Sequence, residues 1–190
     1  MDTNKYTVEP LANSDFSDVV SLGNLVHGNG YLSNEALEEM LQRSTKNDLN
    51  ASFVMRDGDR LIGFRISYAP EQWDIDKWST PEKWPVERSK VAYFKCNTIH
   101  PEYQGQGLGG ILLSTSVEML KKMGAQAGLS HIWMQSPGNA SFKYFTKAGG
   151  ILIKEHKDRW YNDPTSPDYQ CVICGDSCRC VASEMMLVFK

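Results

Sequence analysis

Four glycines within six positions, Gly105, Gly107, Gly109 and Gly110, constrain the fold of this chain more than any other feature. They follow an apolar stretch at 93–100 and precede residues with helical spacing. Glycine has no Cβ and reaches positive φ, so the backbone of such a turn can approach a bulky polar group. Where the turn leads into a helix, several amide N–H groups point at one spot and the helix dipole favours negative charge there. The pattern therefore predicts a phosphate or pyrophosphate site.

Two familiar phosphate-binding patterns fit this turn less well. A Walker-type loop requires Lys followed by Ser or Thr at the helix start, but Ile111 and Leu112 follow Gly110. The spacing Gly105-x-Gly107-x-x-Gly110 satisfies the dinucleotide pattern, yet residues 129–136 hold no acid where that pattern expects a ribose ligand. A nucleotide-dependent oxidoreductase is therefore kept only as an alternative.

A third pattern fits the turn best. The run Gln104-Gly105-Gln106-Gly107-Leu108-Gly109, preceded by His100-Pro101-Glu102-Tyr103, resembles the acyl-coenzyme A signature of the GNAT superfamily of N-acetyltransferases. That signature, Gln/Arg-x-x-Gly-x-Gly/Ala, lies between a central strand and a helix. The resemblance implies transfer of an acetyl group from acetyl-CoA to a primary amine by direct attack in a ternary complex. The acceptor, a small molecule or a peptide, is left open, and an ordinary glycine-rich turn is the plain structural alternative.

Hydrophobic spacing and turn signals predict the order of elements along the chain. Asp57-Gly58-Asp59-Arg60 indicates a hairpin, Asp15 and Ser33 are expected to cap helices, and Gly124 to end one. Strands are expected at 6–10, 52–56, 61–68, 90–100, 131–135, 151–156 and 184–190, and helices at 16–26, 34–41, 108–123 and 139–149. This order, β-α-α-β-β-β-α-β-α-β-β, is that of the GNAT fold, an α/β mixed sheet with helices on both faces. The resemblance implies that the fourth and fifth strands are parallel and splay apart.

Length and composition predict one domain over residues 1–190, and the resemblance implies that it is an N-acetyltransferase domain. The chain is 41% hydrophobic and 23% charged, which is ordinary for a globular domain. A tryptophan-rich insertion at 69–89, with Trp73, Trp78 and Trp84, is expected to pack on the body either as a lid over the cleft or as a simple anchor. A cysteine-rich insertion is expected at 162–183.

Charge and hydropathy limit which binding partners and which cellular compartment we expect. The net charge of −3 argues against nucleic acid as a partner. Residues 1–5 lack the apolar core of a signal peptide, and no apolar run is long enough to cross a membrane. We therefore expect a cytoplasmic protein, and a homodimer is left open.

The resemblance assigns the residues that bind the cofactor. Backbone groups of Asn97, Thr98 and Ile99 would pair with the pantetheine arm, and one of their amides would stabilise the developing oxyanion. Asn139 corresponds to an asparagine that binds the cofactor in the family, although it is also a good N-cap. The amides that would hold the pyrophosphate are those of Gln106, Gly107, Leu108, Gly109 and Gly110. Gln104 and Gly105 would shape the turn before them.

The catalytic positions depart from the family's pattern. The family's acid is a tyrosine four residues before a Gly-Phe pair. That position, counted from Gly149, holds Phe145, so the adjacent Tyr144 is the candidate acid, with a packed aromatic as its alternative. No Asp or Glu lies between 90 and 100, which leaves three candidates for the general base: Tyr93, His100 and Glu102. These departures keep open a catalytically silent acyl-CoA or metal-binding sensor.

Four of the five cysteines lie close together near the carboxyl end. They form the pattern Cys171-x-x-Cys174-x-x-x-Cys178-x-Cys180. Four thiolates within ten residues can surround a tetrahedral Zn²⁺, and a closed set of four favours a structural role over a catalytic one. Redox-active thiols, disulfides and an iron–sulfur centre are the alternatives, and His156 could replace one ligand.

Overall fold

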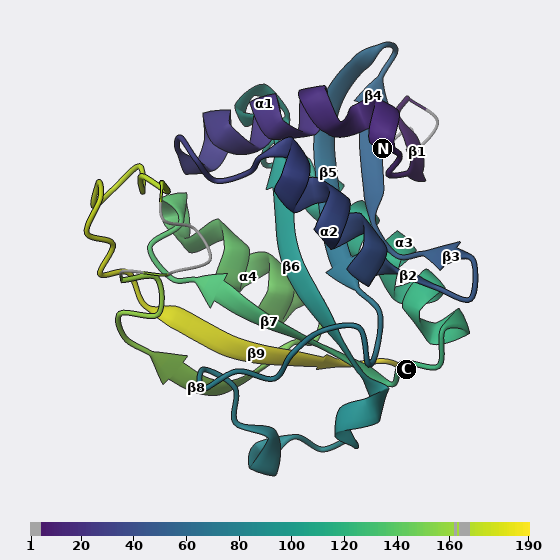
Figure 1. Cartoon of the computed structure of the whole chain (residues 1–190), viewed down its shortest axis with the longest axis vertical. Coiled ribbons are helices and arrows are strands. Elements are labelled where there is room, and N and C mark those ends of the chain that lie inside the picture. Colours follow the sequence, from purple (N-terminus) through teal and green to yellow (C-terminus); the bar gives the residue numbers. More distant parts are fainter. Residues whose placement is uncertain (1–4, 162, 164–167) are drawn as a thin grey trace.

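A seven-stranded sheet with the order β1-β4-β5-β6-β7-β9-β8 forms the centre of the protein (Figure 1). The computed structural model describes residues 5–161, 163 and 168–190. Neighbouring strands are antiparallel except for β6 and β7, which are parallel. The strands are β1 (Thr7–Pro10), β4 (Phe53–Asp57), β5 (Arg60–Tyr68), β6 (Val91–Ile99), β7 (Ala127–Trp133), β8 (Ile151–His156) and β9 (Ala182–Val188), and a separate small hairpin joins β2 (Thr45–Lys46) to β3 (Leu49–Asn50).

Two helices cover each face of the sheet (Figure 1). Strand β5 contacts both pairs of helices because a bulge against β4, at the register shift between Met55 and Arg56, leaves Ile62 without a partner and changes the face it points to. Phe64 and Ile66 pack with α1 and α2, whereas Ile62 packs with Leu112 of α3. The helices are α1 (Phe16–His27), α2 (Asn34–Ser44), α3 (Leu108–Lys122) and α4 (Ala140–Lys147), and short 3₁₀ turns lie at Asn13–Asp15, Pro81–Lys83, Arg88–Lys90, Pro101–Tyr103 and Pro137–Asn139.

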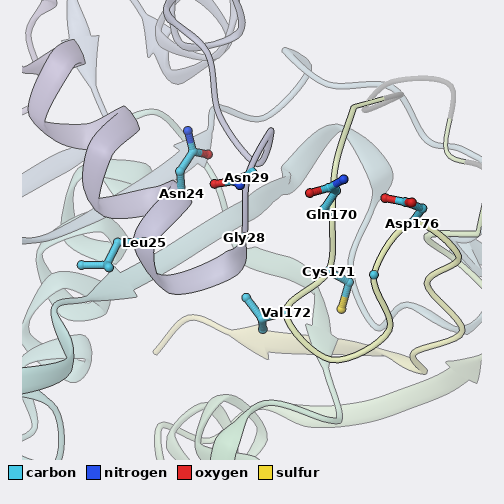
Figure 2. A pocket seen from close by; sticks show the side chains of 9 residues that line it. Asn24, Leu25, Gly28, Asn29, Gln170, Cys171, Val172 and Asp176 are labelled. Atoms are coloured by element: carbon cyan, nitrogen blue, oxygen red, sulfur yellow. The ribbon is translucent and has the colours of Figure 1, made fainter.

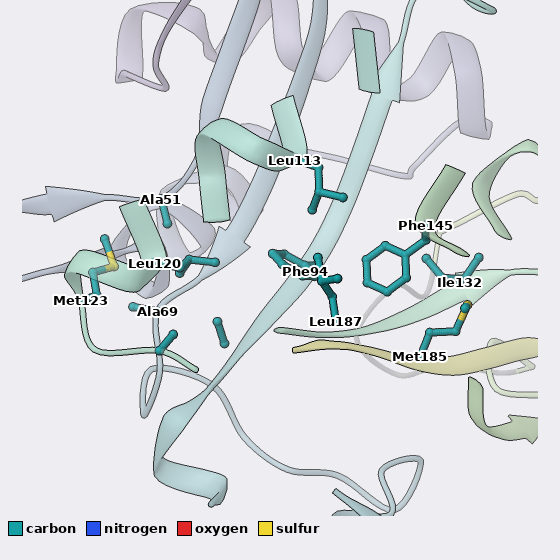
Figure 3. Close-up of a cluster of buried hydrophobic side chains, with 12 residues drawn as sticks. Ala51, Ala69, Phe94, Leu113, Leu120, Met123, Ile132, Phe145, Met185 and Leu187 are labelled. Atoms are coloured by element: carbon teal, nitrogen blue, oxygen red, sulfur yellow. The ribbon is translucent and has the colours of Figure 1, made fainter. Parts of the chain in front are cut away.

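The buried cluster between the sheet and helices α3 and α4 is centred on Phe94 (Figure 3). Its ring meets the ring of Phe145 edge to face, with centroids 5.8 Å apart. A Cβ at Gly128 of β7 would lie 2.2 Å from the Phe94 ring, so only glycine fits there. Burying a phenylalanine of this size stabilises the fold by about 1.5–3 kcal/mol. Phe94 therefore joins β6, β7 and α4 into one unit.

The parallel pair of β6 and β7 separates after three residues. Register partners run only from Val91 with Ala127 to Tyr93 with Leu129. Against β5, Ile66 pairs with Cys96 and Ser67 with Phe94, so Lys95 is an extra residue in β6. Such a bulge bends its strand and increases the local twist. The bulge thus directs the rest of β6 away from β7.

The order of elements predicted from the sequence is confirmed, and so is the parallel fourth and fifth pair. Ser33 caps α2 by accepting a hydrogen bond from the amide of Ala36 at 3.2 Å. Asp15 occupies the predicted position, but its carboxylate accepts from the amide of Ala12 and pairs with Arg56 in place of capping α1. None of the helices in the described part of the chain combines the length and the apolar character that a membrane crossing needs.

Two strand boundaries were predicted wrongly. The fifth strand was expected at 131–135 but is Ala127–Trp133, and the last was expected at 184–190 but is Ala182–Val188. The missed residues Ala127 and Gly128 are small, and small residues carry little signal in a hydrophobic pattern. Gly128 is needed near the start of β7 because Phe94 occupies the space beside it.

A buried carboxylate joins the tryptophan-rich insertion to the sheet. Glu184 of β9 is fully buried and accepts from the amide and hydroxyl of Thr80, at 2.8 and 2.6 Å, and from Trp84 Nε1 at 3.0 Å. Its Oε2 is also 3.0 Å from His156 Nε2, so His156 contacts Glu184. Burial would raise the pKa of Glu184, but the hydrogen bonds from Thr80, Trp84 and His156 outweigh burial and lower it. The insertion is therefore anchored through Glu184.

We expect Glu184→Gln to lower the free energy of unfolding by roughly 1.5–3 kcal/mol, because it weakens hydrogen bonds to a buried charge. A pKa that folding lowers stabilises the protein above the ordinary glutamate value of about 4.3, and this contribution is lost as the pH falls through the lower, folded value. Urea titrations at pH 7 and below pH 4 would show the difference between variant and wild type shrinking in acid. Exposed Glu155→Gln is the control, and an equal loss there would contradict the anchor.

Candidate functional site

The predicted glycine turn lies open at the amino end of α3. Gly105 and Gly107 have φ of +75° and +80°, and Gly107 is the N-cap residue. A Cβ built at Gly105, Gly107 or Gly110 meets no atom within 4 Å, so the space beside the turn is free. The amide of Gly110 donates to the carbonyl of Gly107 at 3.0 Å, whereas the amides before it in the first turn of a helix have no carbonyl partner within the helix and lie at the positive end of its dipole. The turn can hold an anionic group.

Side chains hold this turn against the sheet. Gln104 Nε2 donates to the carbonyl of Ile99 at the end of β6, at 3.0 Å. The Tyr103 hydroxyl donates to Asp57 at 3.0 Å. A Cβ at Gly109 would lie 2.8 Å from Asn97 Nδ2, so this glycine lets the helix approach β6. The turn, β6 and the first turn of α3 therefore form one rigid corner.

Two asparagines predicted to bind the cofactor each carry a buried oxygen without a protein partner. Asn97 Oδ1 and Asn139 Oδ1 have no hydrogen-bond partner among the described residues. Asn139 is the N-cap residue of α4 at φ +53°, yet its side chain makes no capping bond. Buried polar atoms are normally paired, so an orphan indicates a missing water or ligand. Both orphans and the open glycine turn fit a ligand with amide donors and a diphosphate.

The other two predicted residues of β6 point to opposite faces. Ile99 packs with the α3 cluster. Thr98 is buried, and its hydroxyl is 2.9 Å from Nε2 of His27 at the end of α1. Burial lowers the pKa of His27 to about 4, so this imidazole is neutral at pH 7. The Thr98 side chain thus connects the strand to the end of α1, which leaves its backbone for a ligand between the strands.

Tyr144 reaches from α4 across β6 to the central strand. Its hydroxyl accepts a hydrogen bond from Arg65 Nη1 of β5 at 3.0 Å. Arg65 is the register partner of Asn97, and its guanidinium carbon lies 4.4 Å from the centre of the Phe94 ring. The phenol oxygen is therefore on the α3 and α4 side of the sheet, beside the point where β6 and β7 separate.

Aromatic side chains gather on the opposite face, beneath α1 and α2. The His27 and Tyr31 ring centroids lie 4.2 Å apart, and Trp133 of β7 and Tyr169 extend this group. On the same face, the centroid of the Tyr93 ring lies 4.9 Å from that of Trp73 and 5.9 Å from that of Tyr68. The separation of β6 and β7 thus has a polar, glycine-lined approach on one face and an aromatic one on the other.

Of the three candidate bases, only Tyr93 lies where the strands separate. Its hydroxyl is 2.9 Å from Nδ1 of His131, whose Nε2 is 2.6 Å from the carbonyl of Trp78. A carbonyl only accepts, so Nε2 carries the proton and Nδ1 accepts from Tyr93. Burial lowers the pKa of His131 to about 4, which keeps this tautomer neutral. His100 and Glu102 instead contact Arg60 at the start of β5.

The four clustered cysteines meet at one point. Their Sγ atoms all lie within 4.8 Å of one another, and all five cysteines of the chain are free thiols. A tetrahedral Zn²⁺ with bonds of 2.3 Å would space its sulfur ligands about 3.8 Å apart, so the set fits such an ion. Amides of Ile173 and Cys174 donate to the Cys171 sulfur, and hydrogen bonds of this kind orient the ligands of metal sites. The suggestion that His156 replaces a ligand is wrong, because His156 pairs with Glu184.

The cysteine loop packs against the α1–α2 loop, with an open cleft of about 600 Å³ between them (Figure 2). The amide of Gln170 donates to the carbonyl of Asn29 at 2.9 Å, and the Tyr169 hydroxyl donates to that of His27 at 3.1 Å. The cysteine insertion predicted at 162–183 includes residues 162 and 164–167, which lie outside the described residues. The cleft is lined by Asn24, Leu25, Gly28, Asn29, Gln170, Cys171, Val172, Gly175 and Asp176.

Sequence reasoning missed two residues of the site. Arg65 stands alone as a charge inside the apolar run 61–68, and a charge inside a central strand is a signal that could have identified it. His131 had no comparable signal, because its partners Tyr93 and Trp78 are distant in sequence. Only folding brings them together.

Comparison with known proteins agrees with the fold. A solved acetyltransferase from Salmonella typhimurium with acetyl-CoA is 15% identical, with a TM-score of 0.67, over 98% of this chain and 95% of the other. An N-acetyltransferase from Staphylococcus aureus is 11% identical, with a TM-score of 0.69, over 97% and 99%. The NatC complex bound to Gag peptide and CoA is 12% identical, with a TM-score of 0.70, over 98% and 99%. At these identities the likeness shows the fold alone.

No curated protein sequence matches the chain. The model of the acetyltransferase (GNAT) family, in contrast, matches residues 23–150. This range holds α2, the central strands, the glycine turn, α3 and α4. The chain therefore belongs to the GNAT family of acetyltransferases.

Proposed function

We propose that the protein transfers an acetyl group from acetyl-CoA to a primary amine by direct attack in a ternary complex. The observation that carries the proposal is the open glycine turn at the start of α3, beside the separation of β6 and β7. The amides from Gln106 to Gly110 would hold the diphosphate. Asn97, Ile99 and Asn139 would bind the pantetheine arm, which would add to the free edge of β6 like another strand.

The chemistry needs positioning, a base and an acid. The amine nitrogen attacks the thioester carbonyl, the carbon–sulfur bond breaks, and the leaving thiolate takes a proton. We propose Tyr144 as the acid and a backbone amide of Asn97, Thr98 or Ile99 as the donor to the oxyanion. Tyr93 is the proposed base, since among the three candidates its hydroxyl alone lies where β6 and β7 separate.

The aromatic group on the α1 and α2 face is the proposed acceptor wall, defined as His27, Tyr31, Trp133 and Tyr169. Aromatic faces attract ammonium groups, and extended peptides can lie along such a surface. NatC, one of the similar structures, is bound to a peptide and CoA. A small-molecule or peptide amine is therefore the acceptor class we propose. A catalytically silent acyl-CoA sensor is the alternative that the following experiment separates from it.

We expect the protein to release free thiol from acetyl-CoA in the presence of an amine from a panel of peptides and small amines. Gly107→Val, which covers the amide cradle, should weaken CoA binding tenfold or more, which corresponds to about 1.4 kcal/mol. Gly124→Val at the other end of α3 is the matched control, because Gly124 also has positive φ and open surroundings. Calorimetry with CoA and thiol-release assays measure both.

Equal weakening by the two glycine variants would refute the cradle. Tight CoA binding by the wild type without thiol release on any amine would favour the silent sensor.

We further propose that the four cysteines hold a structural Zn²⁺. The residues that would bind it are Cys171, Cys174, Cys178 and Cys180, and the ion would order a loop that contributes few apolar side chains to the core. Through Tyr169 and Gln170 this loop supports the α1–α2 loop, so the ion would stabilise the acceptor wall without taking part in the reaction.

Metal analysis of the reduced protein, purified without added zinc, should find one zinc per chain. Cys174→Ser combined with Cys178→Ser should lose the metal and raise the KM for the acceptor, while the affinity for acetyl-CoA stays near that of the wild type. Cys96→Ser, which changes the cysteine outside the cluster, should keep the metal. Absence of metal in the wild type, or its retention in the double variant, would rule out the site.

A further inference from the structure

Arg65 is a buried cation whose surroundings suggest a task beyond packing. It is 1% exposed on the central strand β5. Within the described ranges, no carboxylate forms an ion pair with it and its Nε has no hydrogen-bond partner. A buried charge without a counter-ion destabilises a fold, and an apolar side chain of similar volume commonly serves stability as well or better. Stability alone therefore does not explain an arginine at this position.

The hydrogen bond to Tyr144 has only one direction. A guanidinium carries five donors and no acceptor, so Arg65 Nη1 must donate and the phenol oxygen must accept. The hydroxyl hydrogen of Tyr144 then points away from Arg65 and is free for another acceptor. The Phe94 ring lies against the guanidinium and, through Phe145, against α4, so the pair is held in place from both sides.

The pair lies where the reacting thioester would be. Arg65 is the register partner of Asn97, whose orphan Oδ1 lies among the residues proposed to bind the pantetheine arm. The Tyr144 oxygen therefore lies over the part of β6 that has left β7. A positive charge next to this oxygen also stabilises the phenolate that remains once the proton has moved.

We propose that Arg65 is the positioning residue for Tyr144. This rests on the proposed function, in which Tyr144 is the general acid. As the carbon–sulfur bond breaks, the phenol gives its proton to the sulfur of CoA, the guanidinium stabilises the phenolate, and water returns a proton after the products leave. The resulting role is indirect, because Arg65 acts through Tyr144 and does not contact the thioester itself.

A double-mutant cycle tests this inference. Tyr144→Phe should lower kcat about 100-fold, as expected for loss of a general acid, and Arg65→Met about 10-fold with an unchanged KM for acetyl-CoA. If Arg65 acts through Tyr144, the double variant should be no slower than Tyr144→Phe alone. Thermal unfolding should show Arg65→Met as stable as the wild type, because an apolar side chain replaces an unpaired charge. Arg56→Met, on the neighbouring strand, is the control for losing an arginine and should keep the wild-type kcat.

The remaining outcomes distinguish failure of the role of Arg65 from failure of the proposed function. Additive losses in an active protein, or a raised KM for acetyl-CoA with normal kcat in Arg65→Met, would overturn the role of Arg65 and leave the proposed function standing. A wild type that binds CoA but releases no thiol with any amine would overturn the proposed function, and the inference with it.

Discussion

The separation of β6 from β7 is the constraint on which the rest of the site depends. Backbone groups on the edge of a strand are normally paired, and here pairing stops at Tyr93 and Leu129. The bulge at Lys95 turns β6 away, and just past the last register pair the Ser130 hydroxyl donates to the carbonyl of Phe94 at 3.0 Å. The edge beyond is left for another molecule, which is why an extended cofactor arm suits it.

This separation gives the two faces of the sheet different tasks. On the α3 and α4 side, glycines and asparagines leave polar groups and open space. On the α1 and α2 side, aromatic rings pack closely, and the cysteine loop supports them from outside. In the proposed reaction, acetyl-CoA and the amine would therefore approach from opposite faces and meet where the strands part.

Three buried polar groups show how the same physics serves stability and function. Glu184 has four hydrogen-bonding contacts, so its charge stabilises the insertion that it anchors. Asn97 lacks a partner at Oδ1, and Arg65 lacks one at Nε and a counter-ion among the described residues. Complete pairing is expected of structural groups, and incomplete pairing at a preformed site leaves capacity for a ligand or a reacting group. Whether a buried polar group stabilises the fold or serves the site therefore depends on its hydrogen-bond partners and not on its residue type.

Much of this protein follows from local sequence patterns. The grouped glycines, the Asp57-Gly58 hairpin, the Ser33 cap and the cysteine spacing each depend on neighbouring residues, so the order of elements and the clustering of the thiols could be predicted. Tertiary structure decided what depends on distant residues. It placed Tyr144 against Arg65, brought His131 to Tyr93, and directed His156 to Glu184 and away from the cysteines. Sequence patterns report turns and periodicity, whereas a side chain's partners across a sheet are set only by packing of the whole chain.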